Sequence, residues 1–92
     1  GANLECTALP VGMRWWQGGA YGPRRRMIRV SRVDDTVTVM AGCITGTRDD
    51  VARRLSVARH PEWISEIGQD AADRALAQAL ALIDMGVEAV TA

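Results

Sequence analysis

Lysine and phenylalanine are missing from this sequence of 92 residues, which holds only two cysteines and one histidine. A structural zinc site needs four ligands from closely spaced Cys and His side chains. Cys6, Cys43 and His60 are too few and too far apart, so no metal site is predicted. The spacing also shows no Ser-His-Asp or Cys-His pairing and no glycine-rich motif that cradles phosphate. We therefore predict no catalytic residue and no cofactor.

Long apolar runs are absent as well. No stretch of the sequence approaches the roughly 18–20 apolar residues of a membrane span, and the chain does not begin with the charged-then-apolar pattern of a signal peptide. We therefore expect a cytoplasmic protein that does not enter a membrane.

The few cysteines and the lone histidine have simple structural interpretations. Cys6 and Cys43 both stand at alternating apolar positions, and a buried free cysteine behaves as a small hydrophobic residue. Burial is predicted for both, with a disulfide or a reactive thiol as the alternatives. His60 precedes Pro61 between two helical stretches, where a helix-boundary role is favoured over that of a catalytic base.

The charge of the chain is balanced in total but divided along its length. Eleven arginines and eleven acidic residues give a net charge of zero, yet residues 1–60 hold ten of the arginines and residues 61–92 hold six of the acids. Such asymmetry favours a basic contact surface, unless the two halves neutralise each other in the fold. The length predicts a single domain over residues 1–92, with residues 1–46 strand-rich and basic and residues 47–92 helical and acidic towards the C-terminus.

The clearest pattern predicts a β-hairpin. Residues 24–33 and 36–44 are rich in β-branched side chains and flank Asp34-Asp35. A two-residue loop at these aspartates sorts the apolar residues onto one face, and a shift of one residue would mix the faces. Asp-Asp is a weaker turn than Asn-Gly, so a slightly longer loop is the alternative. The predicted cross-strand pairs are Val33–Thr36, Arg32–Val37, Val30–Val39, Ile28–Ala41 and Arg26–Cys43.

The residues before the hairpin are less regular. Residues 3–9 alternate as a short strand would, and residues 13–16 are a second candidate. Residues 17–23 contain three glycines and a proline, which predicts a flexible loop.

Helices are predicted over the second half of the chain. Thr47 is a suitable N-cap, and two aspartates follow it in the first turn. Pro61 should end this helix and begin another, because the residue before a proline avoids the α region. The second helix extends to Met85 with Gly86 as its C-terminal cap and residues 87–92 as a frayed tail. A break at Gly68 is the alternative.

These elements predict an α+β fold. We expect a small antiparallel sheet, made of the β-hairpin plus one N-terminal strand, packed on one face by two C-terminal helices. The residues expected to form the core are Ile28, Val30, Val39, Val51, Leu55, Ile67 and Leu76.

The candidate binding residues lie on and before the hairpin. Arg, Trp and Tyr dominate binding hot spots, and aromatic rings also stack on bases. Adjacent strand residues face opposite sides, so only one of the two neighbouring tryptophans can belong to the core. The predicted partner-binding residues are Trp15, Trp16, Tyr21, Arg24, Arg25, Arg26, Arg29 and Arg32.

Two functions from different classes fit this pattern. The first is a non-catalytic binding protein, an accessory or inhibitor protein of a bacterium or phage that occupies a surface of a larger protein or nucleoprotein. The alternative is a nucleic-acid-binding domain that uses the Arg-rich hairpin and the nearby aromatics. In strand order the chain resembles the sheet-reading DNA-binding domains at the N-termini of phage-type integrases, although its acidic last helix departs from them.

Apolar residues on the second sheet face favour self-association. Met27, Val33 and Met40 fall on the face opposite the predicted core, together with Arg29, which pairs with Met40 in the predicted register. Two helices on the core face leave this apolar surface uncovered, so the chain is expected to form a homodimer or to bind another partner there.

Overall fold

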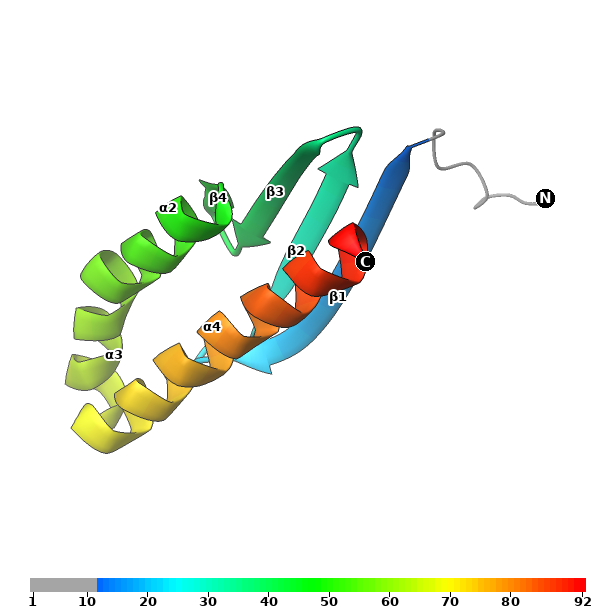
Figure 1. Ribbon diagram of the computed structural model, residues 1–92. Helices are drawn as coiled ribbons and strands as arrows, with labels where there is room; N and C mark the ends of the chain where they lie inside the picture. Colours follow the sequence, from blue (N-terminus) through cyan, green and yellow to red (C-terminus); the bar gives the residue numbers. More distant parts are fainter. Residues whose placement is uncertain (1–11) are drawn as a thin grey trace.

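The computed structural model describes residues 12–92. The strand predicted over residues 3–9 and the burial of Cys6 lie outside the described residues. Within them the chain forms an antiparallel sheet of four strands followed by helices, so the α+β prediction is confirmed (Figure 1). The strands are β1 (Met13–Tyr21), β2 (Arg26–Val33), β3 (Thr36–Ala41) and β4 (Ile44–Gly46), and each pairs with the next.

The hairpin register is the predicted one. Val33 pairs with Thr36 across the two-residue loop, and Val30 pairs with Val39. Asp34 adopts a φ of 54°, which is the left-handed conformation that a tight hairpin loop requires and that Asp tolerates better than most residues. The short loop therefore holds despite its unfavourable sequence.

The second arm of the hairpin is shorter than predicted. β3 ends at Ala41, and a turn at Gly42 and Cys43 leads into β4, so the predicted Arg26–Cys43 pair is wrong. Gly42 has a φ of 65°, a conformation that glycine adopts without strain and that reverses the chain. Cys43 lies in this turn and is exposed, so the prediction of its burial is also wrong.

The glycine-rich segment before the hairpin is a strand and not a flexible loop. β1 extends through Gln17 and Gly18 to Tyr21, paired with β2 over this length apart from an irregularity between Gly19 and Tyr21. β1 is an edge strand, and the backbone groups on its inner side pair with β2. This pairing outweighs the low strand propensity of glycine.

The first helical stretch is longer than predicted. It comprises α2 (Arg48–Arg54), a π-helical segment η1 (Leu55–Arg59) and α3 (His60–Ile67). The side chain of Thr47 accepts a hydrogen bond from the Asp50 amide at 3.2 Å, which confirms the predicted N-cap. Pro61 does not end the helix, because the wider π-helical turn just before it relieves the clash of the proline ring with the preceding turn.

The last helix begins later and ends later than predicted. Gly68, with a φ of 89°, breaks the chain between α3 and α4 (Gln69–Thr91), which confirms the alternative of two helices. Gly86 lies inside α4 and caps nothing, and residues 87–91 are helical, so the predicted end at Met85 is wrong. The inward positions of α4 are Ala72, Ala75, Ala79, Ile83, Gly86 and Val90.

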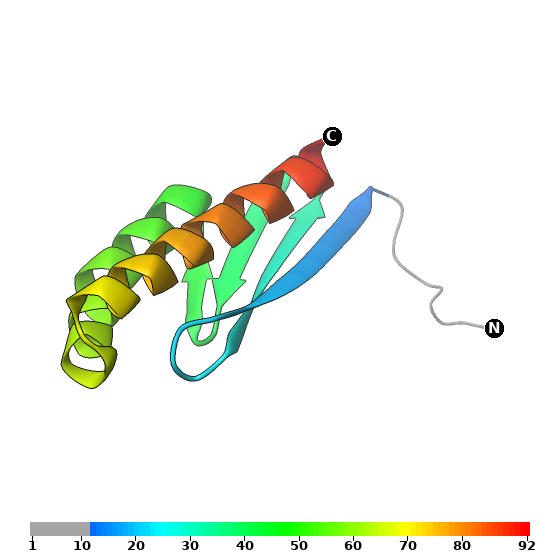
Figure 2. The ribbon, with the colours of Figure 1, turned by 90° about the horizontal axis from the view of Figure 1, so that it is seen from below.

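The helices pack side by side on one face of the sheet. α4 lies across β1 and β2, and α2 lies against β3 and β4 (Figure 2). Of the predicted core, Ile28, Val30, Val39, Val51 and Leu55 are buried. Leu76 is half-buried, and Ile67 is 39% exposed because it stands at the end of α3, just before the break at Gly68.

Candidate functional site

No helix of residues 12–92 packs on the second face of the sheet, which we call the open face. Residues on this open face alternate with the core residues along each strand and lie opposite one another across the sheet, as in the row Gln17, Arg29, Met40 and Thr45. Three of its apolar side chains are substantially exposed: Trp15 at 52%, Met27 at 43% and Val33 at 49%. The open face consists of Met13, Trp15, Gln17, Met27, Arg29, Ser31, Val33, Thr36, Thr38, Met40 and Thr45.

Arg29 is the charged residue of the open face. It pairs with Met40 in the register, as predicted. Its guanidinium group donates to the side-chain oxygen of Gln17 at 3.1 and 3.3 Å, a contact that the sequence did not reveal. Because Gln17 is neutral and none of the open-face positions is acidic, the positive charge of Arg29 is not neutralised locally.

The two neighbouring tryptophans face opposite sides of β1, as predicted. Trp15 is on the open face, while Trp16 is half-buried against the core on the helical side. A Cβ atom on Gly86 would lie 2.5 Å from Trp16 Cε3, so the ring packs directly on the α4 backbone. Trp16 therefore has a packing role and is not part of the open face.

Arg32 also lies on the helical side. Its side chain donates to the Val90 carbonyl at 3.2 Å and to the Asp34 carbonyl at 2.8 Å. Arg14, its partner across β1 and β2, donates to the Ala92 carbonyl. Cations at the C-terminal end of a helix compensate its unpaired carbonyls and dipole, so both arginines hold α4 on the sheet.

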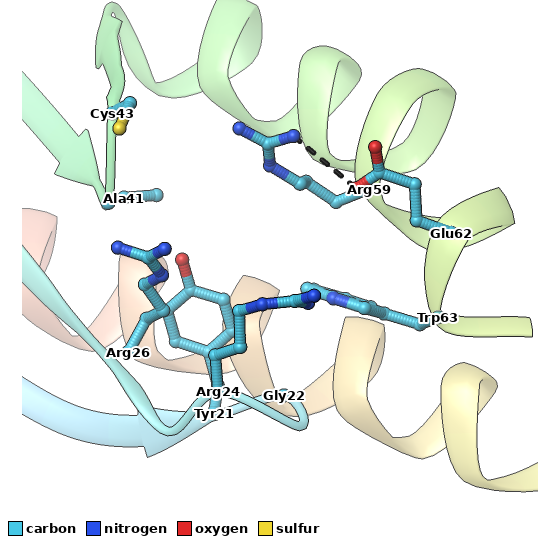
Figure 3. Close-up of a pocket in the computed structure, with 10 residues that line it drawn as sticks. Tyr21, Gly22, Arg24, Arg26, Ala41, Cys43, Arg59, Glu62 and Trp63 are labelled. Carbon is cyan, nitrogen blue, oxygen red and sulfur yellow. Dashed lines mark hydrogen bonds and ion pairs between the residues drawn. The ribbon is translucent and has the colours of Figure 1, made fainter. Parts of the chain in front are cut away.

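The three consecutive arginines have different surroundings. Arg24 forms a two-pronged salt bridge to Glu66 at 2.9 and 3.0 Å, which joins the β1–β2 turn to α3. Arg25 is exposed and adopts a φ of 51° in the turn. Arg26 forms no salt bridge with the residues that the structure describes, and its guanidinium group borders a cavity (Figure 3).

This arginine cavity lies where the β1–β2 and β3–β4 turns meet η1 and α3. Its volume is about 260 Å³. The ring of Tyr21 is only 4% exposed and packs edge-on against Trp63 at a centroid distance of 5.9 Å, so it is not available for stacking on bases. The lining residues are Tyr21, Gly22, Arg24, Arg26, Ala41, Gly42, Cys43, Arg59, Glu62 and Trp63.

The hydroxyl of Tyr21 points into the arginine cavity between Arg26 and Arg59 (Figure 3). Burial raises the pKa of Tyr21, and the positive charges of Arg26 and Arg59 oppose this shift. Arg59 donates to Glu62 at 3.4 Å, a long hydrogen bond. The sequence indicated neither Arg59 nor Trp63 as a site residue, because only the tertiary fold brings α3 against the two turns.

Two further side-chain contacts tie the helices together. Arg48 forms a bidentate salt bridge to Asp84 at 2.8 and 3.1 Å, which lowers the pKa of that carboxyl group. His60 lies 2.7 Å from Asp73, and this hydrogen bond, with a second from Gln69, lowers the pKa of Asp73. His60 is thus a contact between α3 and α4.

Residues 12–92 contain neither a cluster of metal-binding side chains nor a helix able to cross a membrane. No group of three or more His, Cys, Asp or Glu side chains is placed there to hold a metal ion. None of the helices in this part of the chain combines the length and apolar character needed to cross a membrane.

Comparison with known proteins gave no match to a protein-family model, to a curated protein or to a solved structure. No match therefore supports the resemblance to the integrase-type domains that the predicted strand order suggested.

Proposed function

We propose that this chain is a non-catalytic binding protein that docks its open face on a larger protein or nucleoprotein. The observation that supports this function is the position of Trp15 and Arg29 on a sheet face that no helix covers. Trp, Met and Arg are enriched in protein interfaces, and Asp, Glu and Lys are depleted there. The open face has this composition, with Trp15 as the large apolar anchor.

The composition of the open face also indicates the chemistry of the partner. Trp15, Met27 and Val33 require apolar contacts, and Arg29 requires a carboxylate or another acceptor. A two-fold dimer through this face would bring its arginines together without supplying a carboxylate, which is unfavourable. We therefore propose a different protein whose surface is apolar with an acidic group, and self-association becomes an outcome of the test.

Binding of nucleic acid is the second candidate function. It is favoured by exposed Arg25, which lies in the β1–β2 turn. The same sheet carries Trp15 and Arg29 on its open face. The two candidates differ in their response to salt. Phosphate contacts produce a steep linear fall of log affinity with log salt concentration, whereas a mainly apolar protein interface does not.

Affinity capture with paired variants tests the proposal. The open-face variant is Trp15→Ser with Arg29→Ala. The control variant is Met85→Ser with Arg74→Ala, which removes one arginine and one apolar side chain of similar exposure, 55% for Met85, from the outer side of α4. Equal folding of both is checked by circular dichroism.

We expect one protein to bind the wild type and the control variant with similar affinity. The same protein should bind the open-face variant at least about tenfold more weakly. Equal affinity of both variants would contradict it. A concentration-dependent dimer in sedimentation, lost only in the open-face variant, would replace the proposed partner with a second copy of the chain.

A further inference from the structure

The arginine cavity shares no lining residue with the open face. Its lining residues come from two turns, from η1 and from α3. We propose that this cavity binds the phosphate group of a small molecule, held by the Tyr21 hydroxyl and the guanidinium groups of Arg26 and Arg59.

The first observation behind the proposal is the buried hydroxyl of Tyr21. This side chain is 4% exposed, and its oxygen points into the cavity (Figure 3). None of the residues that line the cavity forms a hydrogen bond with the Tyr21 hydroxyl. The side-chain hydrogen bond drawn among these residues joins Arg59 to Glu62. A buried polar group normally has a hydrogen-bond partner. A bound oxyanion would accept a hydrogen bond from this phenol.

The second observation is the arrangement of positive charge around that hydroxyl. Arg26 extends from the start of β2 and Arg59 from the end of η1, so their guanidinium groups lie on different sides of the cavity into which the Tyr21 hydroxyl points (Figure 3). Glu62 is the acidic residue in the lining, and Glu66 engages Arg24 at the rim. Arg26 is left without a salt bridge among residues 12–92 and is available to an external anion.

The direction of the donors favours phosphate over carboxylate. A tetrahedral phosphate group presents oxygens in several directions and accepts from guanidinium groups on different sides. A carboxylate presents two oxygens in one plane and is best met by a single guanidinium fork. Donors that come from three separate elements, β1, β2 and η1, match the tetrahedral group.

The size of the cavity favours a small molecule over a polymer. Its volume of about 260 Å³ is enough for a phosphate group and a short organic remainder. Gly22 and Gly42 form part of the wall, and a Cβ atom on them would lie 3.2 Å from Trp63 and 3.3 Å from Arg26. Their lack of a side chain keeps the space between the two turns open.

Nuclear magnetic resonance of the 15N-labelled protein tests this proposal directly. The protein is titrated with inorganic phosphate, and separately with acetate, while sodium chloride keeps the ionic strength constant. The expected result is a saturable shift of the Gly22 and Gly42 amides and of the Trp63 indole N–H with phosphate. Acetate is expected to shift the same signals at least about tenfold more weakly, if at all.

Three variants show which side chains bind phosphate. Tyr21→Phe keeps the buried ring and removes the hydroxyl, and Arg26→Gln removes the unpaired charge from an exposed side chain. Each is expected to weaken phosphate binding by about fivefold or more. Arg25→Gln removes a neighbouring arginine that does not line the cavity, and it is expected to change the affinity less than about twofold.

Four outcomes would overturn the proposal. The first is a set of shifts that do not saturate with phosphate, and the second is an equal loss of affinity in Arg25→Gln and Arg26→Gln. The third is acetate binding as tight as phosphate binding. The fourth is a short single-stranded oligonucleotide that shifts the same signals and binds far more tightly than phosphate. The open-face variant, Trp15→Ser with Arg29→Ala, should bind phosphate as the wild type does. A failure of the phosphate proposal therefore leaves the proposed function untouched, and the reverse also holds.

Discussion

Gly86 of α4 lies against the indole ring of Trp16 of β1, with no room for a side chain between them. A Cβ atom at position 86 would be 2.5 Å from Trp16 Cε3 and 2.5 Å from Val30 Cγ2. Such a contact cannot exist without displacing the helix or the ring. Because position 86 has no side chain, α4 can cross β1 and β2 at this close distance. The glycine inside the helix therefore has a packing role.

The Gly86→Ala variant is therefore expected to be less stable than the wild type. Alanine would favour the helix by about 0.5–1 kcal/mol, but overpacking against Trp16 and Val30 costs about 1–3 kcal/mol. We expect a net loss of about 1–2 kcal/mol in urea unfolding. Ala81→Gly, at an exposed position of the same helix, reports the propensity effect alone. A gain of stability in Gly86→Ala would show that α4 does not approach the sheet this closely.

The two faces of the sheet should respond differently to the same substitution. Val39→Ala removes two methyl groups from a fully buried position and is expected to reduce the free energy of unfolding by about 1–3 kcal/mol. Val33→Ala makes the same change on the open face, where the side chain is 49% exposed, and should cost less than about 0.5 kcal/mol. Equal losses would mean that the assignment of the two faces is wrong.

The arginines of β2 should also differ. Arg32→Ala removes hydrogen bonds to the carbonyls of Val90 and Asp34 and should cost about 1 kcal/mol. Arg29→Ala combined with Arg25→Ala removes exposed charges that have no carboxylate partner among residues 12–92. The free energy of unfolding should change by less than about 0.5 kcal/mol. Calorimetry of both variants measures this difference. A larger loss in the Arg25/Arg29 variant than in Arg32→Ala would contradict the proposed division of roles.

The Arg48–Asp84 salt bridge should make stability depend on acid pH. Arg48 lowers the folded-state pKa of Asp84 below its ordinary value of 3.8, so the stabilisation is present above that value and is lost as the pH falls through the folded-state pKa. At about pH 7 the Asp84→Asn variant should be less stable by about 0.5 kcal/mol, because the pair is largely exposed. The difference should close below pH 3.8.

Unfolding in urea across this pH range measures the effect. Arg48→Gln provides the control background, in which Asp84→Asn should produce little further change at either pH. A pH-independent difference between the wild type and Asp84→Asn would show that the substitution acts through packing and not through the charge of the carboxylate.

Local sequence signals predicted the parts of the fold whose cause is local. The β-branched pattern and the Asp34-Asp35 loop were enough for the β2–β3 register, and Thr47 with its two aspartates marked the start of α2. The predictions failed where a distant contact decides the outcome. β1 includes a glycine-rich segment because β2 pairs with it, and α4 continues through Gly86 because Trp16 packs there.

The candidate sites show the same division. Alternation along a strand placed Trp15 and Trp16 on opposite faces, and it placed Arg29 on the face away from the core. It could not reveal that Gln17 bonds Arg29. Tyr21 was predicted to be a partner-binding residue, but the fold buries its ring against Trp63.

The sequence by itself determined the class of fold and the register of the central hairpin, because strand alternation and helix capping act over a few residues. The tertiary structure alone decided which arginines are available. Arg14 and Arg32 bind the end of α4, Arg24 pairs with Glu66, and Arg26 lines the cavity together with Arg59 and Tyr21. These partners are up to 78 positions apart in the chain, so only the packing of the helices on the sheet brings them together.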